Sequence, residues 1–298
     1  MEYQPLGKSG LSISRIGFGC MSLGADPVAN TRLLHAAIDQ GINFFDTADL
    51  YDKGQNEEML GAALKAKRKN TLIATKVGNE WNQDGSGWTW NPRKAYIVSA
   101  IEKSLSRLQT DYIDLYQLHG GTLQDDIEET IEAFNQLQQQ GKIRAYGISS
   151  IRPNVIRAYA YRSAACSVMM QYSLLDRRPE ESCLDLLPDK QIGVLARGSL
   201  AGGLLVNKPA RDYLGYAGNE VKKAAEAVAT VSGHIRSCTA TALKFVLQHG
   251  AITSAVVGIR TMEQLTQAVS SMAAPALTEQ EFSLLEQSIP KNYYKEHR

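Results

Sequence analysis

The sequence lacks a surplus of charge of either sign, and it lacks any long apolar run. Its 298 residues carry 32 lysines and arginines against 31 aspartates and glutamates, a formal net charge of +1. Such a chain has no broad basic field to attract nucleic acid or an acidic membrane. No apolar stretch approaches the roughly 18 residues of a membrane-spanning helix, and Met1–Pro5 does not resemble a signal peptide. We expect a cytoplasmic protein that binds neither nucleic acid nor membrane. The local basic run Lys65–Lys69 is interpreted as a solvated helix end.

Cysteine is scarce and scattered. Cys20, Cys166, Cys183 and Cys238 form no CxxC pair, so we expect reduced thiols in apolar surroundings rather than disulfides or a zinc site. None of the five histidines has a second ligand at metal spacing. No metal site is therefore predicted.

Several enzyme motifs are also missing. There is no GxxxxGK[ST] phosphate loop, no HExxH, no GxSxG, and no tyrosine with a lysine four residues later. Gly17-Phe18-Gly19 follows a predicted strand, but Ser22 stands where a dinucleotide fingerprint needs its third glycine. These absences disfavour P-loop, zinc-protease, hydrolase and Rossmann assignments.

What the chain does contain is a regular alternation of short apolar runs and amphipathic segments. Parallel pairing follows from such alternation, and eight strands suffice to close a barrel. No linker divides the chain, so we predict one (β/α)8 barrel domain over residues 1–298. The predicted strands are Ile13–Gly17, Asn43–Asp46, Thr71–Lys76, Tyr112–His119, Arg144–Ser149, Ser167–Gln171, Gly193–Arg197 and Ser254–Gly258.

The helical segments show start and stop signals. Asn91-Pro92 predicts a cap followed by a first-turn proline, and Asp125 or Asp126 predicts the next cap. Gly141 ends that helix. In the tail we expect one helix after Thr261 through Met272 and a C-terminal helix over Thr278–Ser288.

Three further segments fall outside this alternation. Tyr3–Leu6 and Leu11–Ile13 predict an N-terminal β-hairpin that caps the lower end of the barrel. Gly78–Asn91 and the stretch from Ala201 to about Asn219 are predicted as long loops.

Four titratable residues gather where strands are predicted to end. Asp46, Lys76 and His119 close the second, third and fourth strands, and Tyr51 follows Asp46. Barrel chemistry occurs at this end. The Tyr51 hydroxyl can protonate a carbonyl that has accepted hydride if a nearby cation lowers the pKa of the hydroxyl. Lys76 can supply this cation, and Asp46 can orient it. His119 can position the carbonyl through a hydrogen bond. The pattern equally allows a structural ion pair and a buried histidine.

A resemblance to a known family decides between these interpretations. Its motifs are GINFFDTADLYDKGQNEEMLG, IATKVG, SLSRLQTDYIDLYQLH, GKIRAYGISS, QYSLLDR and GIRTMEQL, which span Gly41 to Leu265 in order. With them the chain resembles the aldo-keto reductase family over almost its whole length. The resemblance implies a (β/α)8 barrel, NADPH as hydride donor, and a catalytic tetrad of Asp46, Tyr51, Lys76 and His119.

The same resemblance implies the cofactor contacts. Ser149, Ser150 and Gln171 would hold the nicotinamide carboxamide, with Ser150 in place of the family's asparagine. Arg197 replaces the usual stacked tyrosine, and its charge can also reach a phosphate or an acidic substrate. Gly198 and Leu200 follow it in the cofactor site.

At the adenosine end the family comparison implies a phosphate site before the last helices. Backbone N–H groups at a helix start favour phosphate, and the forked donors of arginine suit a 2′-phosphate. Ala268 replaces the asparagine that commonly contacts adenine. The residues implied are Gly258, Ile259, Arg260, Thr261 and Gln264.

The substrate and the biological role are less constrained. Trp81 and Trp88 can form an aromatic wall for an apolar carbonyl, or they can simply pack on neighbouring helices. We expect a reductase of aldehydes or ketones. A cofactor-binding regulatory or sensor module with little turnover, and an alcohol dehydrogenase working in the oxidative direction, are the alternatives. The oligomeric state stays open.

Overall fold

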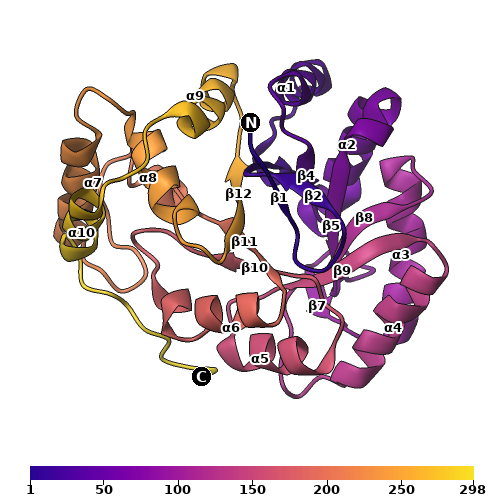
Figure 1. Ribbon diagram of the computed structural model, residues 1–298. Helices are drawn as coiled ribbons and strands as arrows, with labels where there is room; N and C mark the ends of the chain where they lie inside the picture. The colour runs from indigo at the N-terminus through magenta and orange to yellow at the C-terminus, as the bar shows by residue number, and fades with distance from the viewer.

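A computed structural model describes all residues, 1–298, and shows a closed barrel of eight parallel strands (Figure 1). Neighbouring strands follow chain order, and the last strand closes the barrel by pairing with the first, with Ala255 opposite Ile16. The predicted (β/α)8 barrel is thus confirmed. The barrel strands are β3 Ile16–Gly19, β4 Phe44–Asp46, β5 Leu72–Val77, β8 Ile113–Leu118, β9 Ile143–Ser149, β10 Ser167–Gln171, β11 Gly193–Arg197 and β12 Ile252–Gly258.

Helices form an outer ring around the strands (Figure 1). The buried sides of these helices are apolar, as Ile127, Ile131 and Phe134 show in one of them. They are α1 Pro27–Asp39, α2 Gln55–Leu64, α3 Lys94–Leu108, α4 Ile127–Gln139, α5 Pro153–Arg162, α6 Cys183–Asp189, α7 Gly218–Ser232, α8 Cys238–Leu247, α9 Met262–Ala273 and α10 Glu279–Gln287. None of them is long and apolar enough to span a membrane.

The caps of two helices test the predicted starts. Asp126 caps α4 by accepting a hydrogen bond from the Glu129 N–H at 3.0 Å, as one of the two predicted options. The predicted start of α3 at Asn91-Pro92 is wrong. Asn91 instead accepts from the Arg93 N–H in a turn, and the helix begins at Lys94.

The predicted N-terminal hairpin is present and closes the amino end of the barrel. Strands β1 Tyr3–Pro5 and β2 Ser12–Ser14 pair antiparallel. Leu6, Leu11 and Ile13 are buried against inward-facing strand residues and form the floor of the barrel. The first barrel strand therefore begins at Ile16, and its predicted start at Ile13 is wrong, because Ile13 belongs to the hairpin.

The glycines of Gly17-Phe18-Gly19 have a packing role. A Cβ on Gly17 would lie 2.9 Å from the Phe44 ring and 3.3 Å from a methyl group of Val256. Any side chain at this position would displace the inner layer of the barrel.

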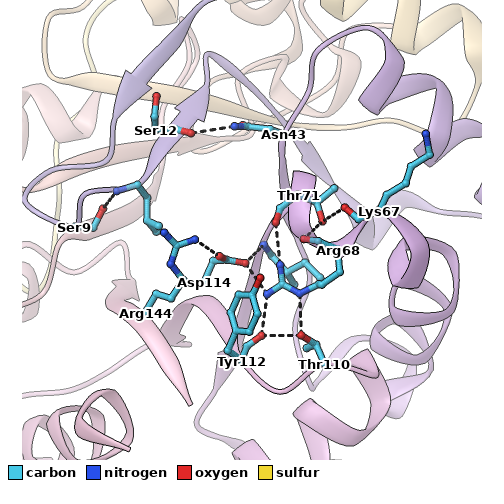
Figure 2. Close-up of polar contacts among 12 residues, drawn as sticks. Ser9, Ser12, Asn43, Lys67, Arg68, Thr71, Thr110, Tyr112, Asp114 and Arg144 are labelled. Carbon is cyan, nitrogen blue, oxygen red and sulfur yellow. Dashed lines mark hydrogen bonds and ion pairs between the residues drawn. The ribbon is translucent and has the colours of Figure 1, made fainter. Parts of the chain in front are cut away.

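A polar cluster lies at the amino end of β8 (Figure 2). Asp114 is fully buried and accepts from Arg68 Nη2, Arg144 Nη1 and the Ile73 N–H at 2.8 to 2.9 Å. The Arg68 guanidinium also stacks on Tyr112, 4.0 Å from the ring centre. The prediction of a solvated helix end is therefore wrong for Arg68. The periodicity of the sequence could not show that this arginine pairs with a carboxylate on a strand more than forty residues away.

The two predicted loops differ. Residues 78–91 contain an antiparallel hairpin, β6 Asn79–Trp81 and β7 Trp88–Trp90, so the loop prediction is wrong there. The stretch after β11 is irregular as predicted, with one short 3-10 turn at Ala201–Gly203 and a bridge between Tyr213 and Tyr216. All four cysteines are free thiols.

Candidate active site

The inner face of the barrel changes from apolar to polar toward the carboxyl end. The layer of strand residues that packs on the hairpin is apolar and comprises Phe44, Ala74, Leu115, Met169, Leu195 and Val256. Side chains of a strand return to the same face at every second residue. The next inward-facing layer on the same strands, two residues further along each, therefore consists of Asp46, Lys76, Gln117, Gln171, Arg197 and Gly258.

Two members of this layer, Asp46 and Lys76, meet the other two predicted catalytic residues, Tyr51 and His119, which come from the segments after β4 and β8. Lys76 Nζ donates to Asp46 Oδ2 at 2.7 Å, to the Thr47 carbonyl at 2.7 Å and to the Tyr51 hydroxyl at 3.3 Å. Lys76 is 1% exposed and Asp46 4% exposed, so this ion pair is shielded from water. The contacts form one chain from carboxylate to ammonium to hydroxyl.

The protonation of this chain follows from burial and contact. Burial lowers the pKa of Lys76, but Asp46 and Tyr51 raise it more, so the ammonium stays charged. Burial raises the pKa of Tyr51, although Lys76 opposes it, and the hydroxyl keeps its proton at neutral pH. Burial also raises the pKa of Asp46 against the opposing effect of Lys76.

His119 stands beside Tyr51. The two rings meet edge to face, with centroids 6.0 Å apart and planes at 84°. Burial, together with the charges of Lys76 and Arg197, lowers the pKa of His119 to about 3. The imidazole is neutral, and its buried Nδ1 has no hydrogen-bond partner.

An unusual turn places Tyr51. It opens the 3-10 segment Tyr51–Gly54, in which Asp52, Lys53 and Gly54 have φ of 48°, 55° and 89°. Left-handed backbone at non-glycine residues is strained and persists only where packing fixes it. At Gly54 a Cβ would lie 2.8 Å from Arg107, so the missing side chain admits this arginine.

Two further carboxyl groups, Asp49 and Glu57, are buried in the segment that contains Tyr51. Glu57 accepts from Arg107 Nε at 2.7 Å and from the Thr75 hydroxyl at 2.6 Å. Asp49 has no such cation, and its Oδ1 is buried without a partner. Burial and the charge of Glu57 raise the pKa of Asp49 to about 8.

The residues predicted to hold the nicotinamide meet at one side of this layer. Ser149 and Ser150 are buried at the end of β9, and the Ser150 Oγ accepts from the Arg152 N–H. The amide of Gln171 accepts from Arg197 Nη1 at 3.2 Å and donates to the Tyr213 hydroxyl at 2.9 Å.

Around that amide, the backbone after β11 makes a tight turn. Gly198 has φ of 70°, and a Cβ there would come within 3.2 Å of Gln171 Cγ. Leu200 is half-buried against the core, and the hydroxyl of the intervening Ser199 is buried without a partner.

The residues predicted to hold phosphate lie between β12 and α9. Gly258 is exposed, and a Cβ there would collide with the Ser22 Oγ. Arg260 is exposed and donates through Nε to the Ser22 carbonyl at 2.9 Å, so the Nη donors of its fork stay available. Thr261 caps α9 by accepting from the Gln264 N–H. An exposed main-chain segment next to an arginine and a helix start fits a phosphate-bearing cofactor.

Three other residues of this segment have defined surroundings. The Gln264 Oε1 accepts from the Arg260 N–H at 2.8 Å, which leaves its amide nitrogen for a ligand. The side chains of Ile259 and Ala268 are buried in the core, so Ile259 can offer only its main chain.

The tryptophans of the β6–β7 hairpin have separate environments. Trp81 and Trp88 are cross-strand partners, and Lys53 Nζ lies 5.2 Å from the centre of the Trp81 ring. Trp88 is 51% exposed. Trp90 packs on the core and donates its Nε1–H to Asp125.

Two residues of the site were missed in the sequence. Gln117 lies on β8 two residues before His119, which directly follows the strand, and strand alternation could have placed both on the inner face. Tyr213 lies in an irregular segment with no periodic signal, so only the folded chain reveals its contact with Gln171.

The geometry agrees with comparisons to known proteins. The sequence pattern of the Aldo/keto reductase family matches residues 15–290. The uncharacterized oxidoreductase YqkF of Bacillus subtilis is 48% identical, over 100% of both chains. The NADH-specific methylglyoxal reductase of Escherichia coli is 34% identical over 72% of each chain.

A solved structure is similar throughout. The holo form of the aldo-keto reductase AKR11C1 from Bacillus halodurans superposes with a TM-score of 0.94 at 45% identity, covering 100% of this chain and 99% of that one. The chain belongs to the aldo/keto reductase family and is a nicotinamide-dependent oxidoreductase.

Proposed function

We propose that this chain, acting as one unit over residues 1–298, reduces aldehydes or ketones to alcohols with NADPH, with Tyr51 as the proton donor. The observation that carries the proposal is the contact chain from Asp46 through Lys76 to the Tyr51 hydroxyl, with bonds of 2.7 and 3.3 Å. When bound, the nicotinamide cofactor supplies the hydride.

The protein's part is to supply a proton and to hold the carbonyl. A carbonyl that accepts hydride becomes an alkoxide, which needs a donor within hydrogen-bond reach. The Tyr51 hydroxyl retains its proton until then, and the Lys76 ammonium stabilises the tyrosinate that remains. Because His119 is neutral, one ring N–H can donate to the carbonyl oxygen without adding a second proton to the reaction.

The predicted cofactor residues have complementary roles. Gln171, steadied by Arg197 and Tyr213, would hold the carboxamide together with Ser149 and Ser150. Gly258, Ile259, Arg260, Thr261 and Gln264 would hold the phosphates and adenosine, and Arg260 favours NADPH over NADH. Gly198 and Leu200 would line the site.

The proposed substrate is a small carbonyl compound that enters beside the β6–β7 hairpin. Trp81 and Trp88 would supply its apolar wall. If the variant with both tryptophans changed to alanine turns over every carbonyl unchanged, this part of the proposal is wrong.

The test of the reaction is NADPH consumption at 340 nm with a panel of aldehydes, for the native chain and for Tyr51→Phe. We expect turnover that falls by about 10²–10⁴-fold in Tyr51→Phe while NADPH still binds. Tight NADPH binding without turnover of any aldehyde would contradict the reductase and favour a regulatory or sensor role.

A further inference from the structure

Gln117 is a buried amide near the carboxyl end of β8. Its side chain is 0% exposed, and its Nε2–H donates to Asp46 Oδ1 at 3.3 Å. Its Oε1 is buried without a partner. Leaving an amide oxygen unpaired in the interior costs free energy, so packing alone would favour an apolar residue here.

The amide can face Asp46 in only one orientation. A carboxylate accepts hydrogen bonds and repels a carbonyl oxygen, so Nε2 must point to Asp46 and Oε1 must point away. Gln117 is also the direct register partner of Lys76 between β8 and β5. Both side chains therefore enter the barrel at the same level and reach the same carboxylate.

The two oxygens of Asp46 thus have different donors. Lys76 binds Oδ2 at 2.7 Å, and Gln117 binds Oδ1. Donors on both oxygens fix the rotation of the carboxylate and so fix the direction in which it holds the ammonium. The Gln117 hydrogen bond also opposes the effect of burial on the pKa of Asp46.

We propose that Gln117 is a positioning residue for proton transfer: it keeps the Asp46 carboxylate aimed at Lys76, which in turn holds its ammonium against the Tyr51 hydroxyl. The proposal rests on the proposed function, because it assumes that Tyr51 donates the proton. Gln117 itself donates its hydrogen bond to Asp46 and not to Tyr51.

The first test is Gln117→Leu, which keeps the approximate volume and removes the donor. We expect kcat to fall about ten-fold at every pH, as for loss of a hydrogen bond to a charged group. The KM for NADPH and its binding measured by fluorescence should not change. Asp114→Asn, at the other end of the same strand, is the matched control for general destabilisation of β8 and should leave kcat unchanged.

The second test is Gln117→Glu, which separates positioning from packing. A neutral glutamic acid can still donate to Asp46, whereas two neighbouring buried carboxylates cannot both ionise easily. We expect near-native kcat at pH 6 and a fall of about ten-fold by pH 9 that the native chain lacks. The free energy of unfolding of this variant should fall as pH rises from about 4.3, the ordinary pKa of a glutamate, to the raised pKa of the folded state.

The outcomes are distinct. A native chain without aldehyde turnover contradicts the proposed function. The role of Gln117 is overturned if the native chain needs Tyr51 for turnover but the pH profile of kcat for Gln117→Glu matches that of the native chain. This outcome does not depend on whether Gln117→Leu folds. Native kcat in Gln117→Leu overturns it as well.

Discussion

Each end of the barrel holds a buried carboxylate paired with basic side chains, but the two clusters are built differently. At the amino end, Asp114 accepts from two arginines and a backbone N–H, and Arg68 uses its remaining donors on backbone carbonyls and a threonine (Figure 2). At the carboxyl end, Asp46 pairs with a single lysine.

The difference lies in what each cluster leaves unpaired. Around Asp46, the Gln117 Oε1 and the His119 Nδ1 are buried without partners, while the oxygens of Asp114 are all engaged. A cluster that only stabilises the fold gains by satisfying every group. A cluster that exchanges protons with a ligand keeps a titratable ammonium and free polar atoms.

The largest expected effect is on the reaction, in Lys76→Met. We expect kcat to fall by about 10²–10⁴-fold because Tyr51 loses the cation that stabilises its ionised form. Stability should fall less than in Asp114→Asn, because an Asp46 carboxyl left without its cation can take up a proton, whereas two guanidinium groups cannot lose theirs. Steady-state kinetics and urea unfolding check this prediction. A kcat within five-fold of the native value would show that the Asp46 cluster, like the Asp114 cluster, only stabilises the fold.

The opposite pattern is expected for Asp114→Asn. Two guanidinium groups lose their carboxylate, so the free energy of unfolding should fall by about 3–5 kcal/mol, while kcat of the folded protein is retained. Most of this loss belongs to Arg68, since the side chain of Arg144 is 49% exposed. Arg144→Ala should therefore cost at most about 1 kcal/mol, and an equal loss in both variants would contradict this division.

A third arginine, Arg260, sharpens the contrast between structural and ligand-binding guanidinium groups. Its single protein contact leaves its forked end available, unlike Arg68. We expect Arg260→Ala to raise the KM for NADPH about ten-fold and to leave that for NADH nearly unchanged. Equal effects on both cofactors would exclude binding of the 2′-phosphate.

The last expected effect concerns Asp49, a buried carboxyl that forms an ion pair with neither an arginine nor a lysine. Its pKa of about 8 lies above the ordinary value of about 3.9, so the folded state binds more protons than the unfolded state between these values. Stability should fall as pH rises from about 4 to 8. Asp49→Asn should match the native chain at pH 4 and be more stable by about 1–3 kcal/mol at pH 9 in urea unfolding; parallel stability profiles would argue against a buried proton here.

The sequence alone determined the barrel and the order of its strands. Period-two and helical patterns are local, and parallel strands joined by helices have few ways to close. It also placed Asp46, Lys76 and His119 at strand ends, because polar residues directly after apolar runs are visible without a fold.

Only the tertiary structure decided which polar groups meet. Arg68 was predicted to be solvated and is instead paired with Asp114, forty-six positions along the chain. Ile13 was predicted in a barrel strand and instead lies in the hairpin that closes the amino end. Gln117 on β8 donates to Asp46 on β4, and β5 lies between these two strands. Pairing, burial and pKa depend on distances between segments remote in sequence, and these distances exist only after the sheet has closed.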